Sequence, residues 1–136
     1  MKRDDIWLKD KLDQIWGLLF PEVPRENNVH VKFKGKSLRR LGCIKKKEDD
    51  SLIEINSLFK DERIPEYVID TTLAHELVHY MHGFNSPLPR KYKHPHKGGI
   101  VDKELIKRGF GYSLKLEKVW AKNQWEKLFK TIKNSF

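Results

Sequence analysis

Residues 65–83 read PEYVIDTTLAHELVHYMHG, and this stretch decides how the rest of the chain is interpreted. Its apolar residues recur at helical spacing, which gives the segment an apolar face: Val68, Ile69, Leu73, Ala74, Leu77 and Val78. Pro65 suits the first turn of a helix, and Gly83 suits the position just past its end. The sequence therefore predicts a helix from Pro65 to His82.

This helix contains the motif His75-Glu76-Leu77-Val78-His79, or HExxH. Positions four apart lie on one helix face with Cβ atoms about 5 to 6 Å apart, so two imidazoles can hold one zinc ion. Glu76 is placed to act as general base on a water molecule at that ion. The composition predicts only roughly 0.02 accidental HExxH matches in a chain of this length. The motif therefore indicates a zinc-dependent hydrolase.

A zinc site of this kind needs a third protein ligand. The candidates are His82, His94, His96, Asp102 and Glu104. His82 lies further along the helix than His79, so we expect it beside the ligands or at the surface. His94 and His96 follow a loop and could close the site from the other side, whereas Glu104 would be the ligand in a glutamate-type site. The residues alone leave this choice open.

The chain has 136 residues and is basic. It contains 28 Lys plus Arg and 19 Asp plus Glu, which gives a net charge of +9. This length predicts a single domain over 1–136. Because Cys43 is the only cysteine, a disulfide and a cysteine-built zinc ribbon are excluded. The sequence has no apolar run of membrane-span length and no signal-peptide core, so we expect a cytoplasmic monomer without membrane contact. The charge suits either nucleic acid or a solvated lysine-rich surface.

The remaining pattern predicts an α+β fold in which helices pack against a small, mostly antiparallel, three-stranded sheet. A helix is expected from Asp4 to Phe20, with Leu8, Leu12, Ile15, Trp16 and Leu19 in the core. Strands are expected at 29–33, 41–44 and 52–55, with a charged turn at 45–50. Helices are expected at 98–107 and 114–132, separated by Gly109 and Gly111; the second has an apolar side of Leu116, Val119, Trp120, Leu128 and Ile132. Trp120 and Trp125 are expected in the core rather than as stacking platforms for bases.

The motif and the order of elements resemble the SprT-like family of zinc metallopeptidases, which includes the Spartan-related proteases of DNA–protein crosslinks. The resemblance covers about residues 4–111 and implies a minimal zincin-like domain. It implies that Zn²⁺ is held by His75, His79 and His96, with Glu76 as base. The setting Pro95-His96-Lys97-Gly98 favours His96, and His94 remains its rival. The basic helix over 112–136 departs from relatives that carry a zinc ribbon, so the resemblance does not extend to their DNA recruitment.

The resulting hypothesis is a zinc-dependent metalloendopeptidase that hydrolyses protein or peptide substrates, including DNA-associated or DNA-crosslinked proteins. The strand at Leu52–Asn56 is expected to hold the substrate by backbone pairing. Tyr80, Arg90 or Tyr92 would stabilise the oxyanion. One alternative is a non-catalytic, basic nucleic-acid-binding domain with a structural zinc; another is a zinc hydrolase acting on a different bond. Nucleic acid would bind at the basic clusters: Lys32, Lys34, Lys36, Arg39, Arg40, Lys45–Lys47, Arg90, Lys91, Lys93 and Lys97.

Overall fold

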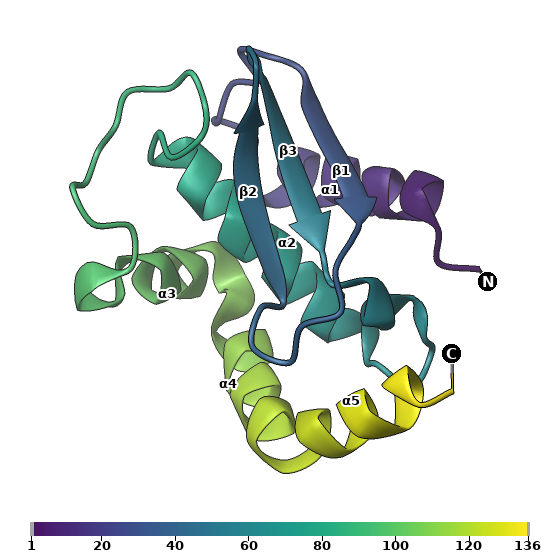
Figure 1. The fold of residues 1–136 in the computed structure, drawn as a ribbon. Coiled ribbons are helices and arrows are strands. Elements are labelled where there is room, and N and C mark those ends of the chain that lie inside the picture. The colour runs from purple at the N-terminus through teal and green to yellow at the C-terminus, as the bar shows by residue number, and fades with distance from the viewer. Residues whose placement is uncertain (1, 136) are drawn as a thin grey trace.

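The computed structural model describes residues 2–135, and its helices and strands follow the predicted order (Figure 1). The elements are α1 (Asp5–Leu19), β1 (Val29–Phe33), β2 (Gly42–Lys47), β3 (Asp50–Ile55), the short helical turn η1 (Ser57–Lys60), α2 (Glu66–Met81), α3 (Ile100–Leu105), α4 (Gly111–Trp120) and α5 (Glu126–Lys133). The prediction of an α+β fold is therefore confirmed.

The sheet is mixed, with the strand order β1-β3-β2. The central strand β3 runs parallel to β1, where Val31 is paired with Ile53, and antiparallel to β2, where Ile44 is paired with Ile53. The prediction of a mostly antiparallel sheet was wrong because the chain crosses from β1 to the far edge before it returns between the two strands. Ser51–Ile55 are all buried, as a strand with neighbours on both sides requires.

The β2–β3 connection is tighter than the predicted charged turn over 45–50. Lys45, Lys46 and Lys47 all belong to β2, and Lys47 is paired with Asp50. The chain reverses at Glu48 and Asp49, where Glu48 has a φ of 56°. The lysine side chains are exposed, so the backbone can form a strand although the sequence lacks apolar alternation.

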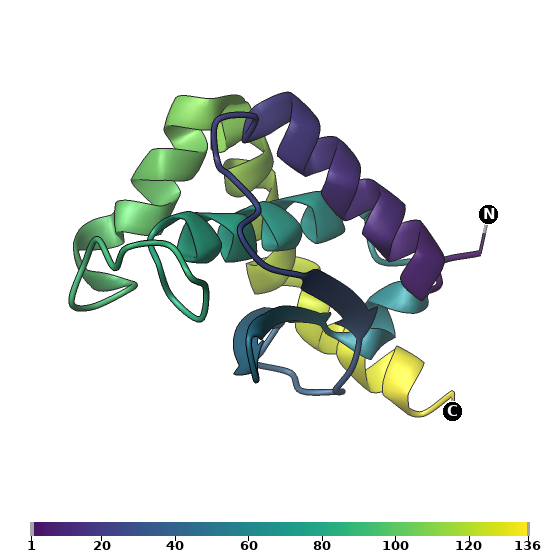
Figure 2. The same cartoon turned by 90° about the horizontal axis from the view of Figure 1, so that it is seen from above.

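Helix α2 runs through the middle of the molecule, between the sheet and the helices α1 and α3 (Figure 2). Its residues Val68, Leu73 and Val78 are completely buried, and the ring of Tyr80 lies 5.1 Å from that of Trp16 in α1. Of the five α1 residues expected in the core, only Leu19 is exposed. The HExxH helix is therefore held on several sides, which fixes the direction of its polar side chains.

The C-terminal helices α3 and α4 pack against α2, and α5 packs against η1. The predicted break at Gly109 is present, because its φ of 97° is not helical, but α4 starts directly afterward at Gly111. A π-helical stretch at Ala121–Trp125 joins α4 to α5. Trp120 and Trp125 are buried with ring centroids 5.4 Å apart, which confirms their core role. Val119 was expected on the apolar side but is 58% exposed.

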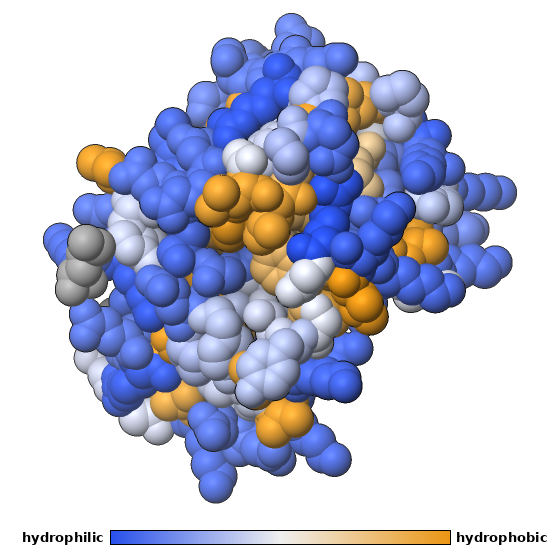
Figure 3. All heavy atoms as spheres, turned by 180° about the vertical axis from the view of Figure 1, so that it is seen from behind, coloured by the Kyte–Doolittle hydropathy of each residue, from blue (hydrophilic) through white to orange (hydrophobic). Residues whose placement is uncertain are grey.

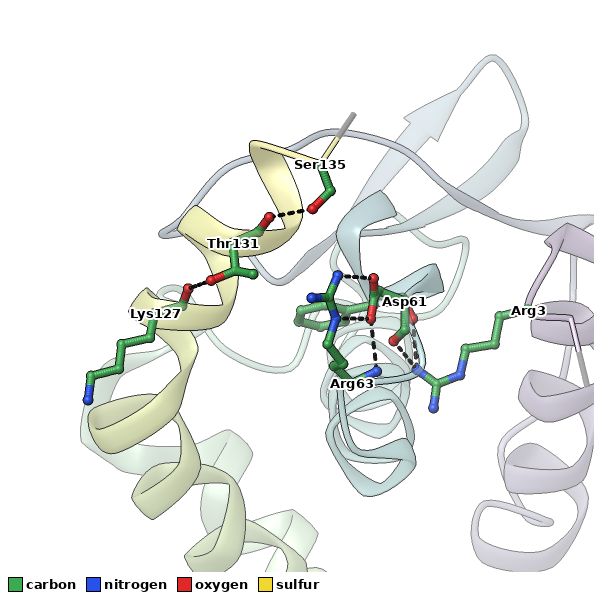
Figure 4. A network of polar contacts seen from close by, with 7 residues as sticks. Arg3, Asp61, Arg63, Lys127, Thr131 and Ser135 are labelled. Carbon is green, nitrogen blue, oxygen red and sulfur yellow. Dashed lines mark hydrogen bonds and ion pairs between the residues drawn. The ribbon is translucent and has the colours of Figure 1, made fainter.

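Polar contacts tie the chain around η1, the turn that leads into α2 (Figure 4). The Arg3 side chain donates to the carbonyls of Phe59 and Asp61, and Arg63 forms a two-bond ion pair with Asp61. Figure 4 also shows Thr131 donating to a carbonyl of its own helix α5. The Arg3 contacts hold the chain just before α1 against the turn that leads into α2.

The face opposite to that of Figure 1 carries separate apolar patches among hydrophilic side chains (Figure 3). None of the helices within residues 2–135 combines the length and the apolar character needed to cross a membrane.

Candidate metal centre

The structure brings together three histidines, two from α2 and one from the segment that follows its loop. His75 and His79 lie one turn apart on α2, and their Nε2 atoms are 3.1 Å apart. The Nε2 atom of His96 lies 3.0 Å from that of His79. The ligand atoms of all three lie within 4.8 Å of one another. This set is the one that the sequence motif and the resemblance predicted.

The loop after α2 places His96 by a series of backbone contacts at the helix end. Gly83 has a φ of 81°, and a Cβ atom there would lie 2.4 Å from the carbonyl oxygen of Pro89. The Phe84 N–H donates to the His79 carbonyl, and the Lys91 N–H donates to the His82 carbonyl. The loop is thus anchored at both sides of its bend before it reaches His96.

The other ligand candidates do not belong to this set of three. His94 is exposed and lines a separate surface hollow with residues 90–93. His82 is buried, as a neighbour of the cluster rather than a surface residue, and its ring packs against Tyr92 at 4.8 Å. The carboxylates of Asp102 and Glu104 are held by Lys118 at 3.0 Å and by Arg108 at 2.8 Å. Among the described residues, the geometry therefore favours His96.

The three imidazoles fit a zinc ion. Tetrahedral coordination with bonds of 2.0 to 2.1 Å separates two ligand nitrogens by roughly 3.3 Å, which is close to the distances of 3.1 and 3.0 Å from His79 Nε2 to the Nε2 atoms of His75 and His96. A neutral imidazole nitrogen either donates or accepts one proton, so His79 Nε2 cannot form good hydrogen bonds with both neighbours. A cation at the centre would satisfy all three lone pairs. His79 Nδ1 is buried and has no hydrogen-bond partner within residues 2–135, so the usual acceptor behind a metal-bound histidine is missing here.

The electrostatic environment keeps two of these histidines neutral. Burial lowers the pKa of His75 to about 4, with His96 adding to the effect. Burial lowers the pKa of His79 to about 3, with His75 and His96 adding to it. Because metal binding requires the deprotonated ring, neither histidine would have to lose a proton at neutral pH.

Glu76 lies beside the cluster and is only 4% exposed. Burial raises the pKa of its carboxyl to about 8, and the positive charge of Arg40 acts in the opposite direction. Within the described part of the chain its side chain makes no hydrogen bond or ion pair, and Arg40 acts on it only through its charge. A buried carboxyl without a partner is costly, so Glu76 has the character of a functional rather than a structural residue.

A cavity of about 480 Å³ opens at the cluster, between β2 and α2. Its lining includes Gly42, Cys43 and Ile44 of β2 together with Glu76 and the three histidines. Because β3 has strands on both sides, the prediction that Leu52–Asn56 holds a substrate was wrong. The edge strand that faces the cavity is β2.

Asn85 lies beside Ile44 at the free edge of β2. Its side-chain amide donates to the carbonyl of Ile44 at 2.8 Å, and its own carbonyl accepts from Ser51 at 2.6 Å. Asn85 also has a positive φ of 52°, a conformation that asparagine tolerates better than most residues. The β2 edge is therefore occupied at Ile44, and its available part lies toward Gly42.

The proposed oxyanion donors do not line this cavity. The Tyr80 hydroxyl donates to the Asn27 side chain and accepts from the Glu26 N–H. The prediction that Tyr80 stabilises the oxyanion was therefore wrong. The Arg90 side chain donates to the carbonyls of Tyr92 and Lys93 and lies over the ring of Phe84. The ring of Tyr92 packs against that of His82.

Arg40 lines the cavity instead. The sequence offered it only as one member of a basic cluster. Its position next to Gly42, at the start of the edge strand, becomes apparent once β2 is placed beside α2. A guanidinium there could stabilise negative charge that develops near the cluster.

Comparison with known proteins identifies no relative: no family model, no curated protein and no solved structure matches the chain.

Proposed function

We propose that this protein is a zinc-dependent metallopeptidase of the SprT-like type. The observation that carries the proposal is the convergence of three imidazole nitrogens beside a buried carboxyl without a partner. Zinc would be held by His75, His79 and His96 through their Nε2 atoms. When bound, the ion would activate a water molecule and polarise the carbonyl of a scissile peptide bond.

Glu76 would then move the proton. Burial raises the pKa of Glu76 to about 8, and a zinc ion beside it would favour the ionised carboxylate, which is the form that can take a proton. In the first step it would take a proton from the attacking water, and in the second it would deliver this proton to the leaving amine. Burial prevents bulk water from competing for the proton at this carboxylate.

The substrate would lie along the exposed edge of β2, near Gly42. A strand at the edge of a sheet presents unpaired N–H and C=O groups, and an extended peptide can pair with them. Gly42 lets the start of β2 approach α2 closely, because an added Cβ would come within 2.7 Å of the Thr72 side chain. Backbone pairing tolerates many sequences, which suits a protease acting on unstructured segments.

Four proteins test this proposal: the wild type, Glu76→Gln, His96→Ala and the matched control His94→Ala. Metal content is measured by elemental mass spectrometry after zinc is supplied, and hydrolysis is measured with an unfolded protein substrate. We expect about one zinc per chain in all but His96→Ala. We expect hydrolysis in the wild type and His94→Ala, with a loss of about 10²- to 10⁴-fold in Glu76→Gln.

The result contradicts the proposal if the wild type binds no zinc, or if Glu76→Gln hydrolyses substrate as well as the wild type does. A nucleic-acid-binding domain with a structural zinc would also bind zinc in the wild type and in Glu76→Gln. It would hydrolyse the substrate in none of the four proteins. The net charge of +9 supports testing the same reaction with and without DNA. We include DNA-associated proteins among the proposed substrates on this ground.

A further inference from the structure

A second cavity adjoins the candidate metal centre on the other side of Glu76. It has a volume of about 390 Å³ and lies where α2, α3, α4 and the start of β2 meet. It shares Arg40, Gly42, His75 and Glu76 with the cavity at the histidines. A side chain of a peptide lying on β2 could therefore enter it next to the bond to be cleaved.

The walls of this cavity are apolar in part, and charged side chains line the rest: Arg39, Arg40, Glu76, Asp102, Glu117 and Lys118. Leu105 of α3, Leu114 of α4 and Leu41, which directly precedes β2, contribute the apolar side chains. Thr71 and Thr72 also line it, and their hydroxyls donate to helix carbonyls of α2, which leaves their methyl groups as wall surface. Such walls suit the aliphatic part of a long side chain.

One charged group of this cavity is a carboxyl with an unpaired oxygen. Glu117 projects from α4, and its Oε2 atom is buried with no hydrogen-bond partner among residues 2–135. The neighbouring carboxylate of Asp102 is paired with Lys118 at 3.0 Å. Burial, with Asp102 adding to it and Lys118 acting in the opposite direction, raises the pKa of Glu117 to about 7. A cation beside Glu117 would offset both effects and favour the ionised carboxylate.

We infer that this cavity is a substrate side-chain pocket, and that Glu117 makes it select a lysine next to the cleaved peptide bond. The inference rests on the proposed peptidase function. A lysine has a four-carbon stem for the leucine walls and an ammonium group for Glu117. Glu117 lies beyond residues 4–111, the part covered by the family resemblance, so this selectivity would belong to the C-terminal helices of this chain.

Peptides that differ at one position test the selectivity. A set with Lys, Leu, Gln or Glu at the positions flanking a single cleavage site is digested by the wild type, Glu117→Gln and the matched control Glu126→Gln. Glu126 is an exposed α5 residue whose carboxylate pairs with Lys130 at 3.6 Å, so its replacement removes the same charge away from the pocket. The ratio of kcat/KM for Lys over Leu is the measured quantity.

We expect the wild type and Glu126→Gln to prefer Lys over Leu by about tenfold, the effect of one charged hydrogen bond. Glu117→Gln should bring this ratio close to one. A ratio that is equal in the wild type and Glu117→Gln overturns the inference, and so does a wild-type preference for Glu, which would assign selectivity to Arg39 and Arg40 at the pocket rim.

A binding measurement separates the pocket from the activity. N-acetyl-lysine methylamide is titrated into ¹⁵N-labelled wild type and Glu117→Gln, and amide shifts of α3 and α4 are followed. Saturable shifts in the wild type that weaken about tenfold in the variant support the pocket even if no peptide is hydrolysed, in which case only the proposed function fails. Hydrolysis without lysine preference, together with no saturable shifts, overturns the pocket and leaves the function intact.

Discussion

Replacing Glu117 by Gln should stabilise the protein, and the gain should grow with pH. The unfolded chain ionises this carboxyl near its ordinary pKa of 4.5, whereas the folded protein raises the pKa to about 7. Between these values the folded state keeps a proton that the unfolded chain has released, so the free energy of unfolding falls as pH rises. Gln does not titrate and removes this loss.

The size of the effect follows from the two pKa values. The interval from 4.5 to about 7 corresponds to roughly 3 kcal/mol at pH 8. Part of it is already present at pH 5, and Glu117 keeps some solvent contact, which weakens the penalty. We therefore expect the difference in unfolding free energy between Glu117→Gln and the wild type to increase by about 2 kcal/mol from pH 5 to pH 8.

Urea denaturation followed by tryptophan fluorescence measures this difference in the presence of a chelator. The Glu126→Gln variant serves as the control and should track the wild type at both pH values. An advantage of Glu117→Gln that is the same at pH 5 and pH 8 would refute the argument, because it would show that Glu117 ionises near its ordinary pKa in the folded protein.

Three further substitutions have defined outcomes. Zinc at 100 times its dissociation constant should raise the unfolding free energy of the wild type by about 2.7 kcal/mol, and thermal melts of His96→Ala should show little of this gain. Gly83→Ala should cost about 1 to 3 kcal/mol in urea denaturation and weaken zinc binding, because its Cβ would collide with the Pro89 carbonyl and displace the loop; unchanged stability would mean that the loop adjusts freely. Trp125→Ala should cost about 3 to 5 kcal/mol, since it empties a buried site and removes a hydrogen bond to the Leu38 carbonyl. Trp125→Phe, as its control, should lose far less.

The HExxH helix could be predicted from the sequence almost to its ends. The expected range Pro65–His82 differs by one residue at each end from α2, Glu66–Met81. Here all signals are local: apolar periodicity, a proline at the start and a glycine beyond the end. The relative positions of His75 and His79 follow from the helix itself.

The order of the strands could not be predicted in the same way. Each strand is recognisable, but the sequence Leu52-Ile53-Glu54-Ile55 does not say whether its neighbours are β1, β2 or both. The position of β3 depends on the path of the connection between β1 and β2, which carries no periodic signal. For that reason the substrate edge was predicted on β3 rather than on β2.

The walls of the candidate site come from residues without a motif. Arg40 belongs to a run of basic residues, and Glu117 is an acidic residue in a lysine-rich helix. Their roles depend on how α4 and the start of β2 approach α2, which is a matter of tertiary packing. The only sequence signal at Glu117 is its acidity between Lys115 and Lys118, and charged helix positions of this kind usually face solvent.

The three consecutive lysines of β2 affect how the protein behaves in a crowded solution. An exposed edge strand invites pairing with the edge of another molecule, which is a common start of aggregation. Lys45, Lys46 and Lys47 place hydrated charges along one half of this edge, and Asn85 occupies the carbonyl of Ile44 next to them. The stretch at Gly42 stays open to an incoming backbone. The strand can therefore accept a flexible peptide while it resists the extended, in-register pairing that would join two copies of the chain into a continuous sheet.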